Sequence, residues 1–113
     1  MNKVVLIGRL TNDVEARTSN DMTIARYRLA VDRRKKDEAD FISCVCFGKT
    51  ADFAERYLKK GSKVAVTGRI QTGSYEKEGR KVYTTEVVVE DHEFCEKRET
   101  GFDIPNDVED LFK

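Results

Sequence analysis

The sequence of 113 residues contains no tryptophan, one proline, one histidine and no long apolar run. No stretch approaches the roughly twenty apolar residues that a membrane-spanning helix needs. The apolar start of the chain is short and is interrupted by Arg9, which is not typical of a signal peptide. An odd number of cysteines, three, suits a reducing compartment. We therefore expect a cytoplasmic protein with no membrane association.

Residues that bind metals are also scarce. Cys44 and Cys46 lie two apart in an apolar run, Cys95 is remote from them, and His92 is the single imidazole. A structural zinc ion needs about four such ligands at loop spacings. We expect the cysteines to be buried structural thiols and His92 to be exposed among its acidic neighbours. The sequence predicts neither a metal site nor another cofactor.

The charges balance overall, with 21 basic and 21 acidic side chains, but they are unevenly distributed. Residues 1–95 hold 18 basic and 15 acidic side chains, whereas residues 96–113 hold 3 basic and 6 acidic ones. The chain is long enough for one domain with a modest core. We expect a mildly basic domain over residues 1–95 and a short, flexible, acidic C-terminal tail over residues 96–113.

Hydrophobic periodicity predicts five strands and one helix. The expected strands are residues 4–10, 23–33, 41–47, 63–72 and 81–90, and the expected helix is residues 50–60, capped by Gly61. Residues 14–17 are expected to continue the first strand past a bend. Gly68 within the fourth strand indicates a bulge or a sharp curl. Residues 75–80 are expected to form a charged hairpin loop.

Five strands with a short helix between the third and the fourth are typical of the OB-fold, a five-stranded, partly open Greek-key barrel. The expected class is therefore all-β with one short helix. A one-helix α+β sandwich is an alternative that the pattern leaves open. The third strand is apolar on both faces, so a second layer, a subunit or a ligand must cover the second face.

The expected ligand face of such a barrel carries aromatic and basic residues. An OB-fold binds its ligand on strands two and three and on the loops next to them. Arg26 and Arg28 lie on the polar face of strand two, Phe41 and Phe47 share one face of strand three, and Tyr75 opens the loop after strand four. Bases of single-stranded nucleic acid stack on aromatic rings, at roughly 1–3 kcal/mol per base.

Phosphate contacts require lysine and arginine near the stacking residues. The candidates are Lys3, Arg26, Arg28, Arg33, Arg34, Lys35, Lys36, Lys49, Lys59 and Lys60. We assign Tyr27, Phe53 and Tyr57 to the core and count Tyr83 as structural, since a single aromatic residue in a strand or helix is more often buried than functional.

Several stretches of the chain match the pattern of one known family. They are residues 1–10 (MNKVVLIGRL), 29–33 (LAVDR), 40–45 (DFISCV), 47–51 (FGKTA), 57–62 (YLKKGS), 66–72 (VTGRIQT) and 83–88 (YTTEVV). In this order and spacing the sequence resembles the bacterial and phage single-stranded-DNA-binding proteins along essentially its whole length. Each stretch alone is weak evidence for the family, and their shared order and spacing make the resemblance specific.

The resemblance implies an OB-fold homotetramer that binds and protects single-stranded DNA, independently of its sequence, during replication, recombination and repair. It implies base stacking at Phe41, Phe47 and Tyr75. Basic contacts are implied at Lys3, Lys49, Lys59 and Lys60. The family often carries tryptophan at stacking positions, and this chain has none. We hypothesise that each base stacks less strongly here and that the basic side chains of the loop at residues 33–36 offset the loss of affinity.

The acidic tail is similar to the tip by which this family docks replication and repair proteins. The tip corresponds to Glu109, Asp110, Leu111 and Phe112, although Lys113 follows the phenylalanine. A disordered solubilising end is the alternative. Two other functions are alternatives for the whole chain: an OB-fold nuclease, and an OB-fold protein-interaction or primosome-assembly module that binds DNA only weakly. No metal or nucleophile motif favours a nuclease, so we expect a protein that is not an enzyme.

Overall fold

The computed structural model describes residues 1–95 and contains six strands and one helix. The elements are β1 Val4–Leu10, β2 Glu15–Ser19, β3 Met22–Asp32, β4 Ala39–Phe47, α1 Lys49–Tyr57, β5 Lys63–Lys77 and β6 Arg80–Phe94. The expectations for the tail concern residues 96–113, which lie outside the described residues. The expected all-β class with one short helix is confirmed.

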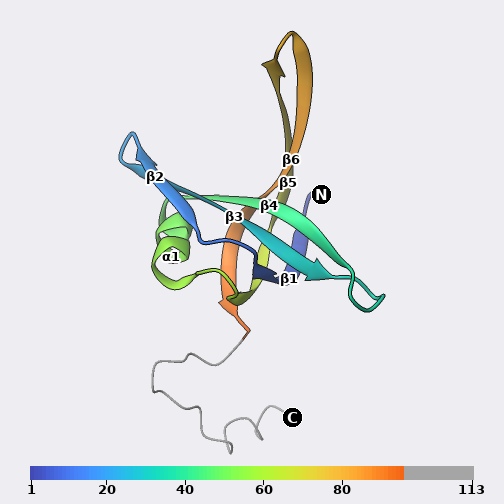
Figure 1. Ribbon diagram of the computed structural model, residues 1–113. Helices are drawn as coiled ribbons and strands as arrows, with labels where there is room; N and C mark the ends of the chain where they lie inside the picture. The colour runs from blue at the N-terminus through green and yellow to red at the C-terminus, as the bar shows by residue number, and fades with distance from the viewer. Residues whose placement is uncertain (96–113) are drawn as a thin grey trace, which may run out of the picture.

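Five of the strands close into a barrel. The sheet order is β1-β5-β6-β4-β3-β2, and β1 also pairs with β3, which completes the ring (Figure 1). The neighbours β4 and β6 run parallel, whereas the other pairs are antiparallel. This is the Greek-key order of an OB-fold, so the sandwich alternative is wrong. Two seams, β1–β3 and β4–β6, are formed by only two paired positions each.

The segment after β1 does not continue that strand as expected. Instead, β2 pairs with the first half of β3, from Glu15 opposite Arg26 to Ser19 opposite Met22. The reversal occurs at Asn20 and Asp21, which both have positive φ. Asn and Asp tolerate this conformation, and two-residue turns of this kind match the twist of a hairpin. The turn residues Asn20 and Asp21 therefore mark the turn of the β2–β3 hairpin, and residues 14–17 do not continue β1.

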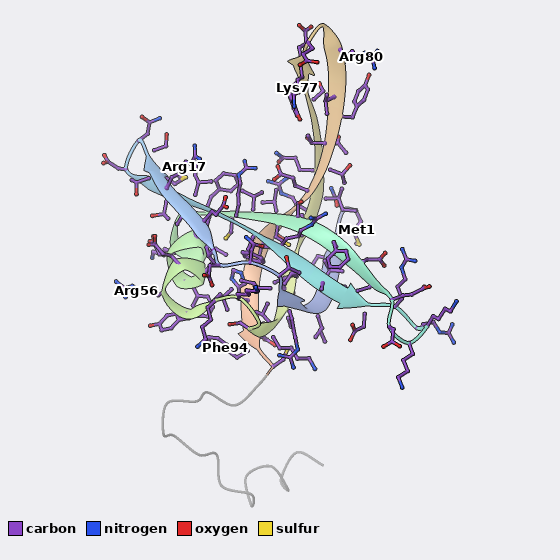
Figure 2. All side chains as sticks on the ribbon, in the orientation of Figure 1. Met1, Arg17, Arg56, Lys77, Arg80 and Phe94 are labelled. Carbon is purple, nitrogen blue, oxygen red and sulfur yellow. The ribbon has the colours of Figure 1, made fainter. Side chains whose placement is uncertain are left out.

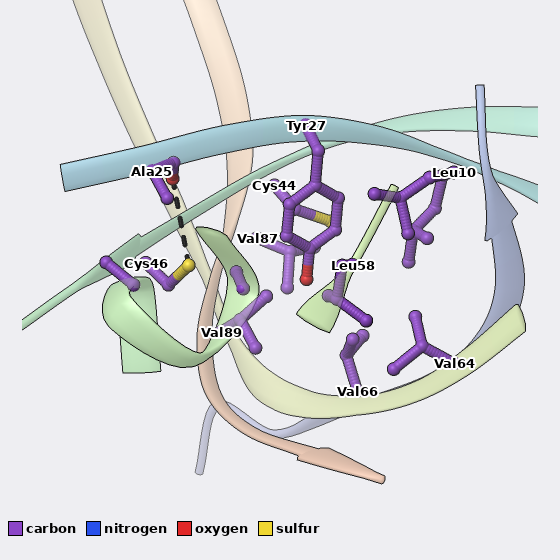
Figure 3. Packing of buried hydrophobic residues seen from close by; sticks show 13 residues of the cluster. Leu10, Ala25, Tyr27, Cys44, Cys46, Leu58, Val64, Val66, Val87 and Val89 are labelled. Atoms are coloured by element: carbon purple, nitrogen blue, oxygen red, sulfur yellow. Dashed lines mark hydrogen bonds between the residues drawn. The ribbon is translucent and has the colours of Figure 1, made fainter. Parts of the chain in front are cut away.

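The core fills the inside of the barrel (Figure 3). The predicted alternation of β3 is confirmed, because Ala25, Tyr27 and Leu29 are buried and the intervening arginines are exposed. Cys44 and Cys46 are buried on the same side of β4, as predicted, and burial raises the pKa of each thiol to about 12. The prediction is wrong for Cys95, whose side chain is exposed just after β6.

The helix α1 packs one side against the barrel through Ala51 and Ala54. It ends at Tyr57, earlier than expected, because the next residue, Leu58, is extended and its N–H donates to the carbonyl of Ala54. Gly61, three residues further on, is therefore not the cap. Tyr57 is also not a core residue: it is 48% exposed, and its ring meets those of Phe53 and Phe94 at the surface.

A β-bulge reverses which residues of β6 face the core. Gly68 pairs with Val89 and Thr67 with Asp91, so Glu90 is an extra residue in β6. A side chain at Gly68 would overlap the carbonyl oxygen of Val88, which explains the glycine. Before the bulge Val87 and Val89 face the core, and after it His92 does.

His92 is consequently half-buried, and the expectation that it is exposed is wrong. Its Nε2 lies 2.7 Å from the hydroxyl of Tyr27, and its ring stacks on Phe53 at 5.4 Å between centroids. Burial lowers the pKa of His92 from 6.5 to about 4, although the carboxylate of Asp91 acts in the opposite direction. The same burial raises the pKa of Tyr27.

Beyond the barrel, β5 and β6 continue as a long two-stranded ribbon (Figures 1 and 2). Pairing extends to Lys77 opposite Arg80, which Figure 2 labels at the tip, so the expected loop over residues 75–80 is wrong. Tyr75 lies within β5 opposite Val82. Tyr83 is 75% exposed on this ribbon, so the expectation that it is a buried structural residue is wrong.

Candidate nucleic-acid interface

The outer face of β4 carries the two phenylalanines that the pattern singled out. Phe41 is 58% exposed and Phe47 is 40% exposed, whereas Val45 between them is buried. The inward face of the same strand already supplies Cys44 and Cys46 to the core. Both rings are therefore available to a ligand without loss of core packing.

An arginine lies against one of these rings. The guanidinium carbon of Arg28, on the outer face of β3, is 5.5 Å from the centroid of the Phe41 ring. The strands are in a register that places Arg28 opposite Ser43 and Ala30 opposite Phe41, so the contact is diagonal. A cation beside an exposed ring offers a stacking surface and a phosphate partner at one place.

Arg26 lies on the same face but is already paired. Its Nη1 donates to Oε2 of Glu86 at 2.9 Å, across from β3 to β6. The side chains are 57% and 23% exposed, respectively. The sequence pattern predicted the arginine but not its carboxylate partner, because the two residues are sixty positions apart and only the β4–β6 seam brings them together.

A shallow pocket of about 370 Å³ surrounds this ion pair. It is lined by Thr11, Asn12, Glu15, Arg26, Tyr27, Arg28, Ser43, Cys44 and Glu86. Asn12 is held in place, since its side-chain oxygen accepts a hydrogen bond from the backbone N–H of Arg28 at 3.1 Å. The pocket therefore has a fixed polar rim beside the exposed phenylalanines.

The ribbon continues the outer face with a second group of residues. Tyr75 is 52% exposed and shares its face with its partner Val82. Because successive residues of a strand alternate between faces, Lys77 and Arg80 lie on this face also. The sequence analysis does not predict these two cations. Lys77 is two residues from Tyr75 and Arg80 is two residues from Val82. This spacing indicates a shared face once residues 75–80 are recognised as strands.

Tyr83 lies on the opposite face of the ribbon. Its cross-strand partner is Ser74, and Lys81 Nζ is 5.7 Å from its ring centroid. Glu76 pairs with Lys81 in the ladder, so this second face has balanced charge. The cationic face of the ribbon is the one that carries Tyr75.

The basic loop after β3 is less cationic than its sequence suggests. Arg33 donates to Asp40 through Nε at 2.8 Å and Nη2 at 2.6 Å, which lowers the pKa of that carboxyl. The two carboxylate oxygens of Glu38 lie 3.7 Å from their nearest partners: Oε2 from Arg33 Nη1, and Oε1 from Lys35 Nζ. Within residues 1–95, no ion pair of this kind involves Arg34 or Lys36, which leaves these two as the more available cations of the loop.

The other predicted basic residues are scattered around the barrel. Lys3 precedes β1, and Lys49 begins α1 two residues after Phe47. Lys59 and Lys60 lie in the turn between α1 and β5, where the backbone N–H of Lys60 donates to Asp13 at 2.9 Å. The structure therefore gathers Arg26, Arg28 and the phenylalanines on one face but does not bring all ten cations together.

Residues 1–95 contain no group of three or more His, Cys, Asp or Glu side chains that could hold a metal ion. In the same residues, no helix has the length and apolar character to cross a membrane.

A closed five-stranded barrel whose outer face presents exposed aromatic rings beside arginines is an OB-fold of the nucleic-acid-binding class. Comparison with known proteins is more specific. Residues 1–95 match the single-strand binding protein family, and the chain belongs to this family. Its members are non-enzymatic binding proteins, so the chain is not an enzyme.

Several curated relatives are similar over most of the chain. A single-stranded DNA-binding protein of Clostridium perfringens is 53% identical over 105 residues, which cover 89% of this chain and 70% of the relative. Single-stranded DNA-binding protein 1 of Streptococcus pyogenes is 49% identical, with 88% and 82% covered. A single-stranded DNA-binding protein of Halalkalibacterium halodurans is 50% identical, with 87% and 62% covered.

Proposed function

We propose that this chain binds and protects single-stranded DNA, independently of sequence for the most part, during replication, recombination and repair. Bases stack on Phe41, Phe47 and Tyr75, and basic side chains contact the phosphates. Membership of the single-strand binding protein family and the names of its relatives support the binding of single strands. The cytoplasm is the proposed location.

The contact between Arg28 and Phe41 is the observation that supports this site most directly. A core phenylalanine would be enclosed, but the Phe41 ring is mostly exposed and lies against a guanidinium group. Duplex bases hide their faces in the stack, whereas unpaired bases can lie on such a ring. The site therefore favours single strands over duplex.

The proposed phosphate contacts divide into two groups. Arg28, Arg34 and Lys49 lie near the stacking rings in sequence or in space, and Lys77 and Arg80 extend the path along the ribbon. The remaining proposed contacts are Lys3, Arg26, Arg33, Lys35, Lys36, Lys59 and Lys60. We expect Arg33 and Lys35 to contribute less, because their carboxylate partners offset their charge.

The decisive experiment is fluorescence anisotropy with labelled oligo-dT and a labelled duplex of the same length, at several salt concentrations. We expect nanomolar binding of the single strand, strong preference over duplex, and affinity that falls as salt rises. Equal affinity for both forms, or no binding at all, would overturn the proposal. Loss of labelled oligo-dT on addition of magnesium or calcium would instead indicate a nuclease.

We also propose that the chain assembles as a homotetramer. The outer face of β1 supports this, because Val5 is 67% exposed and Ile7 is 53% exposed beside each other on one side of the strand. Contiguous exposed apolar surface is one of the marks of a protein–protein interaction site. Sedimentation equilibrium should give four times the chain mass, and Val5→Lys should reduce it; a monomer at micromolar concentration would contradict the proposal.

For the tail we propose docking of replication or repair proteins through Glu109, Asp110, Leu111 and Phe112. The support is the sequence pattern of acidic residues before Leu-Phe. Full-length Phe112→Ala should lose binding to such a partner in a titration but bind oligo-dT normally. Equal partner binding by both chains would favour the solubilising role.

A further inference from the structure

The ribbon of β5 and β6 leaves the barrel with little packing to fix its direction. Every residue of β5 from Arg69 to Lys77 is exposed. The β1–β5 ladder ends at Gly68, the β4–β6 ladder has two rungs, and within residues 1–95 no other strand of the barrel pairs with the ribbon. A two-stranded ribbon without further packing is at best marginally stable. Its direction relative to the barrel therefore depends on polar contacts at its base.

Asn2 makes such a contact through its side chain. Its Nδ2 donates to the carbonyl oxygen of Ile70 at 2.7 Å, and its Oδ1 accepts from the backbone N–H of Ile70 at 2.9 Å. The β1–β5 register, in which Val4 lies opposite Gly68, places position 2 opposite position 70. The amide group of Asn2 therefore supplies the two hydrogen bonds that the backbone of a longer β1 would make there. Figure 1 shows this end of the chain beside the base of the ribbon.

A second contact holds the other strand of the ribbon. Glu86, which lies opposite Gln71 at the ribbon base, accepts a hydrogen bond from Arg26 of β3 at 2.9 Å. Asn2 thus holds β5 on its β1 side, and Arg26 holds β6 on its β4 side. The ion pair is partly exposed, and such pairs contribute little. Asn2, with two hydrogen bonds to one backbone residue, is the stronger of the two contacts.

The direction of the ribbon matters for a DNA strand that follows it. Tyr75, Lys77 and Arg80 share one face of the ribbon, whereas the stacking rings of Phe41 and Phe47 lie on β4. A ligand that contacts both groups binds more tightly when they are already aligned, because less conformational entropy is lost on binding. A ribbon that swings about its base would lose this advantage.

We infer that Asn2 is a positioning residue for DNA binding. It acts through the ribbon, whose outer face it holds in line with the stacking rings of β4. This inference rests on the proposed function and adds to it a residue that basic charge and aromatic stacking do not explain.

Amide hydrogen exchange tests the contact itself. Asn2→Ala removes both hydrogen bonds, so the N–H of Ile70 should exchange faster in the variant than in the natural chain. Asn20→Gly is the matched control: it removes another exposed asparagine, at a position of positive φ that glycine adopts readily, and should leave exchange at Ile70 unchanged. Equal exchange at Ile70 in Asn2→Ala and the natural chain would overturn the inference.

Anisotropy with labelled oligo-dT at several salt concentrations tests the role. We expect Asn2→Ala to bind about fivefold more weakly, the factor that two weak hydrogen bonds supply together, and to show a smaller salt slope because the ribbon cations meet phosphates less often. In a chain that already carries Tyr75→Ala, Lys77→Gln and Arg80→Gln, Asn2→Ala should cause no further loss, since the two sets of changes act through the same contacts.

The comparison of the two backgrounds separates positioning from a general effect on the fold. An equal loss in both backgrounds would mean that Asn2 does not act through the ribbon and would overturn the inference, as would no loss in the natural background. Failure of the natural chain to bind oligo-dT would overturn the proposed function instead, whereas exchange at Ile70 would still report the contact.

Discussion

At the residue scale, the exposed fraction separates Tyr27 from the aromatic side chains of the interface and the ribbon. Tyr27 is 3% exposed and lies in the core, whereas Phe41, Phe47, Tyr75 and Tyr83 range from 40% to 75%. The sequence alone predicts that Phe41 and Phe47 are exposed, because the opposite side of their strand already has its own apolar set. It misplaces Tyr83, since a two-stranded ribbon beyond the barrel has no inside and periodicity there does not report burial.

Phe41→Ala and Phe47→Ala should each weaken binding to oligo-dT with little change in melting temperature. Loss of one stacked base costs about 1–3 kcal/mol, a factor of about 5 to 150 in affinity. The exposed rings contribute little to folding, so the effect should be confined to binding. Anisotropy and thermal denaturation provide the two readouts.

Leu29→Ala, which removes a fully buried side chain, serves as the contrasting variant because it should lower the melting temperature. If Phe41→Ala or Phe47→Ala lowered the melting temperature as much, the ring in question would be a core residue and its place in the interface would be lost.

The buried contacts of His92 predict a pH dependence of stability. Its folded pKa of about 4 lies below the ordinary value of 6.5, so between these values the unfolded chain binds a proton that the folded chain resists. Stability is therefore full above pH 6.5 and is lost as pH falls toward 4. The loss is up to about 3 kcal/mol, reduced because the ring is only half-buried.

Chemical denaturation between pH 7 and pH 5 measures this loss before most carboxylates titrate. His92→Gln, which can still bond the hydroxyl of Tyr27 but does not titrate, should show a flatter profile than the natural chain. Parallel profiles for the two proteins would mean that other groups cause the acid sensitivity.

At the scale of elements, local pattern predicts the barrel strands well and fails where tertiary geometry intervenes. The alternation of β3, the two-faced β4 and the bulge at Gly68 are all visible in the sequence. The sequence does not show that this bulge turns His92 toward the core, because only the strand pairing reveals that Glu90 is the extra residue. The ribbon was likewise predicted as a loop, since its charged residues resemble those of a turn.

Gly68→Ala should destabilise the barrel by about 2 kcal/mol or more, because the added methyl overlaps the backbone carbonyl of Val88, which cannot move freely. Gly73→Ala is the matched control on the same strand: its methyl meets only the hydroxyl of Thr84, at 3.2 Å, and that side chain can rotate. Denaturant unfolding of both variants tests the difference, and equal destabilisation would mean that the strand pairing adapts to a side chain at Gly68.

The ribbon tip should contribute to binding mainly through charge. Replacing Lys77 and Arg80 together with glutamine should lower the slope of log affinity against log salt by about 1.4 units, given about 0.7 for each phosphate contact with a single strand. Lys81→Gln, on the opposite face, should change the slope little. An unchanged slope in the double variant would show that the strand does not follow this face of the ribbon.

At the scale of the whole molecule, the charge distribution supports the function better than the total charge does. The chain is neutral overall, yet residues 1–95 carry more basic than acidic side chains. The structure refines this further, because carboxylates offset Arg26, Arg33 and Lys35, while Arg28, Lys77 and Arg80 remain beside exposed aromatic rings. Net charge could not predict this, since pairing depends on the fold.

The two seams divide the barrel into halves, β1-β5-β6 and β2-β3-β4, each held internally by longer ladders. Phe41 belongs to one half and Tyr75 to the other, so a DNA strand bound to both bridges the β4–β6 seam from outside. Ligands that bind only the closed form slow its opening and extend its lifetime.

Amide hydrogen exchange should therefore slow at Cys44, Val45, Val87 and Val88 when oligo-dT is bound, although their side chains lie at or near the core. Exchange in the β2–β3 hairpin, away from that seam, should change less. Equal protection everywhere would indicate general stabilisation without bridging. If the amides of the β4–β6 seam are protected first, the DNA acts as a temporary crosslink across it. This short strand pairing is then most stable while DNA is bound.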